Sequence, residues 1–155
     1  MEQRDGAEGR SGSESELREG ALRLLARREH SRKELERKLT SREWSASRVD
    51  RILDELAAEG LQSDARFAAE HLRSRVNRGY GPRKILAELV QKGVSRELAA
   101  RTLDAADVDW AGVARGIYLT RFGDDAPSDR KERARRWRAM ERRGFPGDVI
   151  AGLLE

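Results

Sequence analysis

Basic side chains are the residues of this sequence whose type and spacing could do chemistry, and that chemistry is the binding of an anionic partner. Residues 71–84 hold five basic side chains and no acidic one, residues 27–42 hold seven basic and three acidic, and residues 128–143 hold eight basic and three acidic. Arginine contacts phosphate or carboxylate through paired hydrogen bonds, so these segments suit a polyanion or an acidic protein surface. Affinity for such a partner falls as salt rises.

The three segments supply the candidate binding residues, which we expect to form a segmented basic surface. They are Lys33, Arg37, Arg73, Arg75, Arg78, Arg83, Lys84, Arg135, Arg136, Arg142 and Arg143. A competing interpretation is that the charges form solvated helix faces with ion pairs four residues apart, and Glu29–Lys33 and Glu34–Lys38 fit that spacing. The second and third segments have few acids to pair with, which favours binding there.

The other polar residues form no arrangement that predicts an enzyme, a metal site or a cofactor site. His30 and His71 are the only histidines, no cysteine is present, and neither histidine has a second ligand at metal spacing. We therefore expect structural or surface roles for both. Asp124, Asp125 and Asp129 lie close together and predict a turn followed by a helix N-cap.

Tyr80 stands among arginines and has two open interpretations. Its ring could stack on a nucleic-acid base or on a partner side chain. Packing across a helix–helix turn is the favoured alternative. Trp44, Trp110 and Trp137 are likewise expected to anchor the core, because they fall at helix ends or on apolar faces.

Helices must position these side chains, since both composition and spacing favour them. The chain has 155 residues, of which 39% are charged, and good helix formers (Leu, Ala, Glu and Arg) dominate. Few aromatic and β-branched residues argue against a β sandwich or barrel, and no apolar run is long enough to span a membrane. Ser31 and Glu34 predict a capping box, and Gly81-Pro82 predicts a helix start.

The helical pattern repeats along the chain with an offset of about fifty residues. That offset aligns Leu35 with Ile85 and Leu39 with Leu89, and a second one aligns Leu89 with Met140. We predict an all-α fold of three tandem three-helix repeats that form an elongated, curved helical array. The expected parts are a disordered acidic N-terminal tail at residues 1–15 and three modules at residues 16–60, 63–108 and 109–155.

Three stretches carry a resemblance to a known family. They are ALRLLARREHSRKELERKL at residues 21–39, SDARFAAEHLRSRVNRGYGPRKILAEL at residues 63–89, and RRGFPGDVIAGLL at residues 142–154. All three resemble the RecX family of regulatory proteins, which modulate the RecA recombinase. The second stretch carries the most distinctive pattern, in which Asp64, Phe67, Ala68, Arg73, Arg75, Gly79, Gly81, Ile85 and Leu89 fall.

The resemblance implies a fold of three tandem three-helix repeats and a function in DNA repair, recombination and the SOS response. It implies binding to the RecA–DNA filament, along its groove, with inhibition of RecA ATPase, strand exchange and co-protease activity. It supplies no catalytic residue. The alternative is a DNA-binding protein of helix-turn-helix type that acts without RecA.

The remaining expectations concern partners and compartment. We expect DNA itself to be bound weakly and without sequence preference, and the protein to be a monomer that needs no cofactor and contacts no membrane. The N-terminal residues contain no secretory signal and the chain contains no cysteine, which predicts a cytoplasmic protein.

Overall fold

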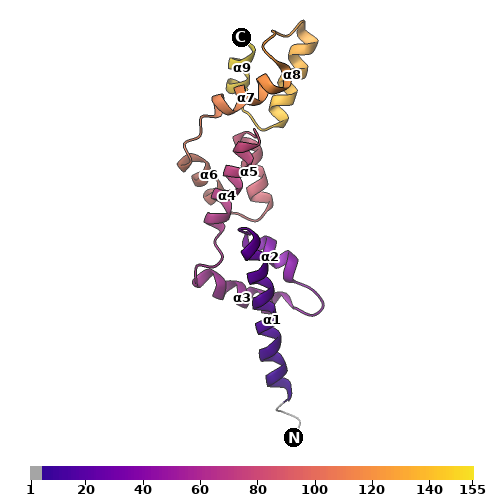
Figure 1. The fold of residues 1–155 in the computed structure, drawn as a ribbon, viewed down its shortest axis with the longest axis vertical. Coiled ribbons are helices and arrows are strands. Elements are labelled where there is room, and N and C mark those ends of the chain that lie inside the picture. The colour runs from indigo at the N-terminus through magenta and orange to yellow at the C-terminus, as the bar shows by residue number, and fades with distance from the viewer. Residues whose placement is uncertain (1–4) are drawn as a thin grey trace. The chain divides into compact units, whose positions relative to one another are not determined.

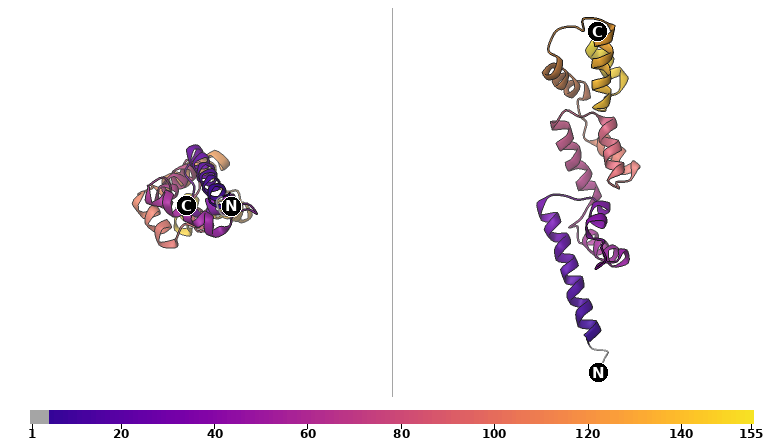
Figure 2. Two further views of the ribbon diagram at one scale, coloured as in Figure 1. Left: turned by 90° about the horizontal axis from the view of Figure 1, so that it is seen from below. Right: turned by 90° about the vertical axis from the view of Figure 1, so that its right-hand side faces the viewer.

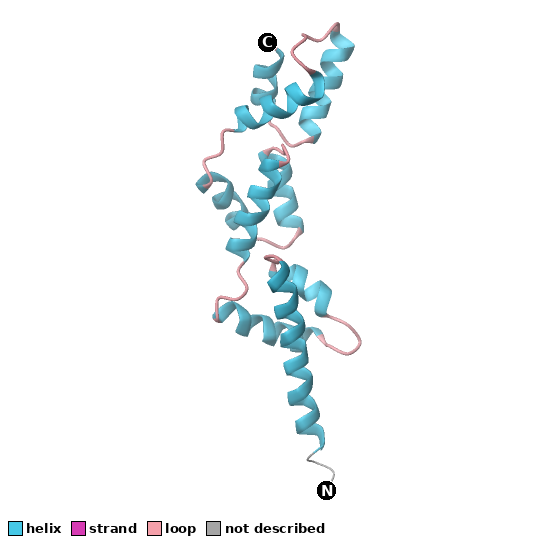
Figure 3. Cartoon of the chain, in the orientation of Figure 1, coloured by secondary structure: helices cyan, strands magenta, loops and turns pink. Residues whose placement is uncertain are grey.

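A computed structural model describes residues 5–155, with side chains described from residue 14 onward, and these residues form nine helices and no strand (Figure 3). The helices are α1 (Asp5–Arg27), α2 (Arg32–Leu39), α3 (Ala46–Ala58), α4 (Asp64–Asn77), α5 (Pro82–Gln91), α6 (Arg96–Ala105), α7 (Trp110–Phe122), α8 (Arg130–Arg142) and α9 (Gly147–Leu154), as labelled in Figure 1. The prediction of an all-α fold built from three-helix repeats is confirmed. No helix in the described range is both long and apolar enough to cross a membrane.

The chain divides into two compact units, residues 1–67 and residues 68–155. In the first unit, α2 and α3 pack beside the C-terminal part of α1 (Figure 2). Leu17, Leu35, Leu53 and Leu56 are fully buried in the core that these helices share, and Trp44 packs against that core. The apolar spacing of the sequence therefore locates this core correctly.

The second unit contains most of α4 and all of α5 to α9. Helices α5 and α6 pack together, with Ile85 and Val94 buried, and α7, α8 and α9 enclose a core that includes Met140 and Phe145. Tyr118 lies in the same core and stacks against Phe122. Each module thus packs an apolar residue into its core just after its second helix, as the repeat predicts.

The predicted helix starts also appear in the structure. Ser31 and Glu34 form the capping box of α2, in which each side chain accepts a hydrogen bond from the other residue's backbone N–H. Helix α5 begins at Pro82, after Gly81. Asp129 caps α8 by accepting a hydrogen bond from the backbone N–H of Glu132, as the predicted turn requires.

Helix α1 starts earlier than the sequence led us to expect. It begins at Asp5, so the structure differs from the expected tail over residues 5–15, and residues 1–4 of that tail lie outside the described residues. The packing of Leu17 and Ala21 fixes the C-terminal part of this helix.

Candidate anion-binding site

The ring of Tyr80 gathers three cations at the start of α5. Lys84 Nζ lies 4.8 Å from the ring centroid, Arg143 Cζ 4.8 Å, and Arg75 Cζ 5.3 Å. We call these four residues the Tyr80 cluster. It joins two of the basic segments that the sequence singled out, because Arg75 and Lys84 come from the second module and Arg143 comes from the third.

Two of the three cations keep their charge uncompensated. Arg143 donates to the backbone carbonyl oxygens of Arg78 (3.0 Å) and Gly79 (3.2 Å), which are neutral acceptors. Lys84 and Arg143 form no ion pair with any carboxylate in the described part of the chain. Arg75 is different, because its Nε donates to Glu88 Oε2 at 2.8 Å.

Glu88 also fixes His71, whose Nε2–H donates to the same carboxylate oxygen at 2.8 Å. Burial lowers the pKa of His71, and this effect exceeds the opposing influence of Glu88. Both Arg75 and His71 thus have structural roles on α4, so Arg75 is the member of the Tyr80 cluster least suited to bind a partner.

Backbone hydrogen bonds hold the two halves of the cluster together. The N–H of Gly81 donates to the carbonyl of Arg143 at 2.7 Å, and the N–H of Arg83 donates to the carbonyl of Gly144 at 3.0 Å. The N-terminal donors of α5 and the carbonyls after α8 therefore satisfy each other. This close approach requires glycine: a Cβ on Gly81 would lie 2.5 Å from the carbonyl group of Gly144, and a Cβ on Gly144 would lie 2.5 Å from Lys84.

Gly144 also has a φ of +99°, a conformation that side chains other than glycine rarely adopt. Gly144 must therefore be glycine for two reasons, its left-handed backbone and its close contact with α5. The turn Gly144-Phe145 is thus more than a helix end, since it carries a contact between the second and third modules.

The predicted binding residues of α8 divide into two groups. Arg142 is exposed and Arg143 belongs to the Tyr80 cluster, but Arg136 is only 7% exposed. Arg136 donates to the hydroxyl of Tyr118 at 2.9 Å and to the carbonyl of Asp125 at 2.7 Å. Its assignment to an exposed binding surface was wrong, because the aromatic core of the third module and a loop carbonyl consume its donors.

Arg135 is exposed but its charge is matched. It forms a two-pronged ion pair with Glu132, with both distances 2.8 Å, and Arg136 also contacts Glu132 at 3.1 Å. Hydrogen bonds from Arg135 and then Arg136 lower the pKa of Glu132 to about 2. The charge of Arg135 is therefore compensated by Glu132, unlike that of Arg143 at the end of the helix that meets Tyr80.

In the first unit, Lys33 and Arg37 are exposed on α2, but many of the surrounding charges are paired. Neither of the expected i,i+4 pairs describes the local partners: Glu29 pairs with Arg66 at 3.0 Å, and Glu34 pairs with Arg28 at 2.9 Å. Tertiary contacts thus replace the pairing that helical spacing suggested. Lys33 and Arg37 remain candidates, while their neighbours have structural partners.

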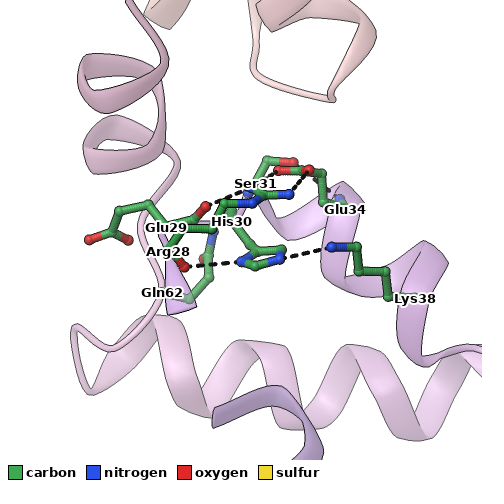
Figure 4. A network of polar contacts seen from close by, with 7 residues as sticks. All are labelled: Arg28, Glu29, His30, Ser31, Glu34, Lys38 and Gln62. Atoms are coloured by element: carbon green, nitrogen blue, oxygen red, sulfur yellow. Dashed lines mark hydrogen bonds and ion pairs between the residues drawn. The ribbon is translucent and has the colours of Figure 1, made fainter. Parts of the chain in front are cut away.

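His30 lies at the centre of this paired region (Figure 4). It is 2% exposed, its Nδ1 lies 3.1 Å from the carbonyl of Arg28, and its Nε2 lies 3.0 Å from Lys38 Nζ. A carbonyl can only accept, so Nδ1 carries the proton and the neutral Nε2 accepts from the lysine. Burial lowers the pKa of His30, and the nearby charges of Arg28 and Lys38 act in the same direction. The predicted structural role of His30 agrees with this geometry.

The same junction continues into α4. Gln62 is buried and donates to the carbonyl of His30 at 3.3 Å and to Asp64 Oδ1 at 3.0 Å. Asp64 Oδ1 also accepts from the backbone N–H of Arg32 at 2.9 Å, the first residue of α2. Within residues 14–155, no group of three His, Cys, Asp or Glu side chains could hold a metal ion.

Comparison with known proteins identifies the family. Residues 18–56 match the first three-helix domain of RecX, residues 63–103 match the second and residues 113–154 match the third. These matches cover more than half of the chain, in the order of the modules. The chain belongs to the RecX family.

Relatives with this name support the same assignment. The chain is 45% identical over 141 residues to regulatory protein RecX of Halorhodospira halophila, covering 90% of this chain and 88% of the relative. It is 41% identical over 138 residues to regulatory protein RecX of Pseudomonas putida, covering 89% of this chain and 88% of the relative. The resemblance found in the sequence is thereby confirmed.

The fold agrees with crystal structures of RecX proteins. One, from Lactobacillus salivarius, has a TM-score of 0.77 and 23% sequence identity, with 92% of this chain and 95% of that chain covered. A second RecX crystal structure has a TM-score of 0.83 and 20% identity, with 99% of this chain and 77% of that chain covered. The three-helix repeat is thus the RecX fold, retained at low sequence identity.

Sequence reasoning identified most members of the Tyr80 cluster but not their relation. Tyr80 and Arg143 are 63 residues apart, and the sequence offers no local signal that they meet. A partial signal was present at Gly81, which is the N-cap of α5 and has no side chain to cap that helix.

Proposed function

We propose that this RecX-family protein binds the RecA–DNA filament and modulates RecA, mainly by inhibiting its ATPase, strand-exchange and co-protease activities. The observation that carries the proposal is the presence of all three RecX domains, in order, along the chain. Membership of a family of regulatory proteins also supports a role in binding rather than catalysis. We further propose that the protein acts in the cytoplasm as a monomer and without a cofactor.

Six exposed cations and two half-buried ones, Lys84 and Arg143, give this proposal its physical basis. We propose that eight of the predicted residues face the filament: Lys33, Arg37, Arg73, Arg78, Arg83, Lys84, Arg142 and Arg143. Arg75, Arg135 and Arg136 are left out, because carboxylates or buried acceptors engage their side chains. Several modules that each bind weakly give useful affinity when they engage one repeating partner together.

The direct test is RecA ATPase on single-stranded DNA with this protein added at substoichiometric amounts. The proposal expects ATP turnover to fall, and expects the protein to co-sediment with preformed RecA filaments. Unchanged turnover together with no co-sedimentation would overturn it. A helix-turn-helix regulator acting without RecA would instead bind duplex DNA tightly at one preferred sequence, which a binding selection on random duplexes would reveal.

A further inference from the structure

Two cations of the Tyr80 cluster, Lys84 and Arg143, have no carboxylate partner within residues 14–155, and two modules fix the position of the cluster. We propose that it binds the sugar–phosphate backbone of nucleic acid, with the exposed Arg78, Arg83 and Arg142 beside it, at a site completed only where the third module meets the second. This inference deepens the proposed function and rests on it for its biological setting, since it assigns nucleic acid rather than protein to this part of the surface.

Charge is the first argument. Lys84 and Arg143 lie against one aromatic ring, and their contacts are with that ring and with neutral backbone carbonyls. Two cations so placed repel each other, and a bound anion removes that cost while gaining favourable interactions with both. A phosphodiester group is an anion of this kind, and Arg and Lys are its usual protein partners.

Positioning is the second argument. The two backbone hydrogen bonds from Gly81 and Arg83 to the α8–α9 turn fix the base of Arg143 beside the first turn of α5. Those bonds also occupy the donors at the start of α5, so the side chains, and not the helix terminus, must bind the anion. Preorganised donors lose little conformational entropy on binding, which favours a site over a loose charged patch.

The surroundings of the cluster favour nucleic acid over a protein surface. Protein interfaces obtain most of their affinity from Trp, Tyr and Arg side chains that insert into well-packed, apolar pockets. Within residues 14–155 the large hydrophobic residues that are exposed are Leu61, Val90 and Leu119, and none belongs to the cluster. The ring of Tyr80 is itself contacted by cations rather than offered to a base, so the site is expected to bind without sequence preference.

The test measures nucleic-acid binding without RecA. Binding of a fluorescein-labelled oligothymidylate is followed by anisotropy over a series of salt concentrations for Lys84→Gln/Arg143→Gln. Each phosphate contact to a single strand contributes about 0.7 to the slope of log K against log salt, so losing two should lower the slope by about 1.4 and weaken binding roughly 20-fold at 0.1 M salt. The matched control is Arg96→Gln/Arg101→Gln, which removes the same charge from exposed positions on α6 and should leave the slope within about 0.3 of the parent.

Circular dichroism and thermal unfolding establish that the variants fold. If Lys84→Gln/Arg143→Gln is unfolded, Arg78→Gln/Arg142→Gln replaces it, because both side chains are exposed, and the same weakening is expected. Equal binding by the cluster variant and the control overturns the inference. If the cluster variant keeps its DNA binding but no longer inhibits RecA ATPase, the site belongs to a protein contact, and the inference fails while the proposed function stands. If ATPase inhibition is absent even in the parent, the proposed function fails independently of the DNA result.

Discussion

The turn before α2 and the turn before α5 occupy the same place in successive modules, yet they differ in chemistry. An offset of fifty residues aligns Ser31 with Gly81, His30 with Tyr80 and Glu34 with Lys84. In the first turn, a serine side chain caps the helix and Glu34 neutralises Arg28. In the second turn, Gly81 has no side chain that could cap α5, so backbone N–H groups at the helix start donate to carbonyls of Arg143 and Gly144 in the next module. Lys84 takes the place of Glu34.

The difference shows how the same position in the repeat can serve either a structural role or a binding role. The first turn carries its own cap, Ser31, and its own counter-charge, because Glu34 pairs with Arg28. In the second turn, backbone carbonyls of the next module accept the hydrogen bonds of the helix start. The same contact brings Arg143 to Tyr80, where it donates to neutral backbone carbonyls. The third residue of the helix, Glu34 in α2 and Lys84 in α5, therefore decides whether the charge around the turn is neutral or positive.

The most severe way to break the second turn is to replace Gly144 with alanine. The added Cβ would lie 2.5 Å from the backbone N and the Cβ of Lys84, at a residue whose φ is +99°. We expect the second unit to lose about 3 kcal/mol of unfolding free energy, since strained backbone alone costs about 1–3 kcal/mol. Urea unfolding in a Trp44→Phe background measures this, because Trp110 and Trp137 then report on the second unit alone.

Gly116→Ala is the control for that substitution. Gly116 lies inside α7, and a Cβ added there would meet no atom within 4 Å, so alanine should raise stability by about 0.5–1 kcal/mol. A Gly144→Ala protein as stable as its parent would show that the α8–α9 turn does not lock the modules together.

The matching change in the first turn is Ser31→Ala, and its effect should be smaller. It removes the side-chain acceptor of the Glu34 N–H, at 3.1 Å, from a buried capping box, which should cost about 1–2 kcal/mol. Hydrogen exchange of the α2 amides measures the loss. Ser45→Ala is the control, because Ser45 is the N-cap of α3 but makes no side-chain cap bond, so less than about 0.5 kcal/mol should be lost.

Local signals explain which parts of this comparison the sequence could predict. The capping box at Ser31, the start of α5 at Pro82 and the buried positions Leu35 and Ile85 each depend on residues within one helical turn. Helix propensity and apolar spacing act over the same range, so the three-helix repeat was predictable from composition and periodicity.

Contacts across the chain explain the remainder. Arg136 resembles any other arginine of a basic run, but its partners, Tyr118 and the carbonyl of Asp125, lie on other elements. Glu29 meets Arg66 of α4 rather than the residue four positions later along the chain. These partners come together only through tertiary packing, so no local sequence pattern could predict them.

Acid should weaken the first turn through the protonation of His30. The folded state lowers the pKa of His30 below its ordinary value of 6.5, so the unfolded chain binds the proton more tightly. The contribution of neutral His30 to stability is therefore complete above about pH 6.5 and is lost as pH falls below that value.

Hydrogen exchange of the α2 amides between pH 7.5 and pH 5.5 tests this effect, after correction for the intrinsic exchange rate. Arg28, Lys38 and Glu34 all act on His30, so the comparison is made against His30→Gln, which should remove the added pH dependence. His71→Gln is the control, because His71 lies in the second unit beside Glu88 and should leave the exchange of α2 unaffected. An unchanged pH response in His30→Gln would rule out the proposed proton linkage.

The smallest and most selective change makes the second turn resemble the first. Lys84→Glu places a carboxylate near Arg143, which pairs with no carboxylate within residues 14–155, and an ion pair at such a half-exposed position should add about 0.5 kcal/mol or less to stability. The same change reverses one charge of the Tyr80 cluster, so it should weaken oligothymidylate binding more than Lys84→Gln does. A Lys84→Glu protein that is slightly more stable but binds oligothymidylate more weakly would show that Lys84 lowers local stability while it provides positive charge for binding. Loss of stability with unchanged affinity would mean that Lys84 serves the fold, as Glu34 does in the first turn.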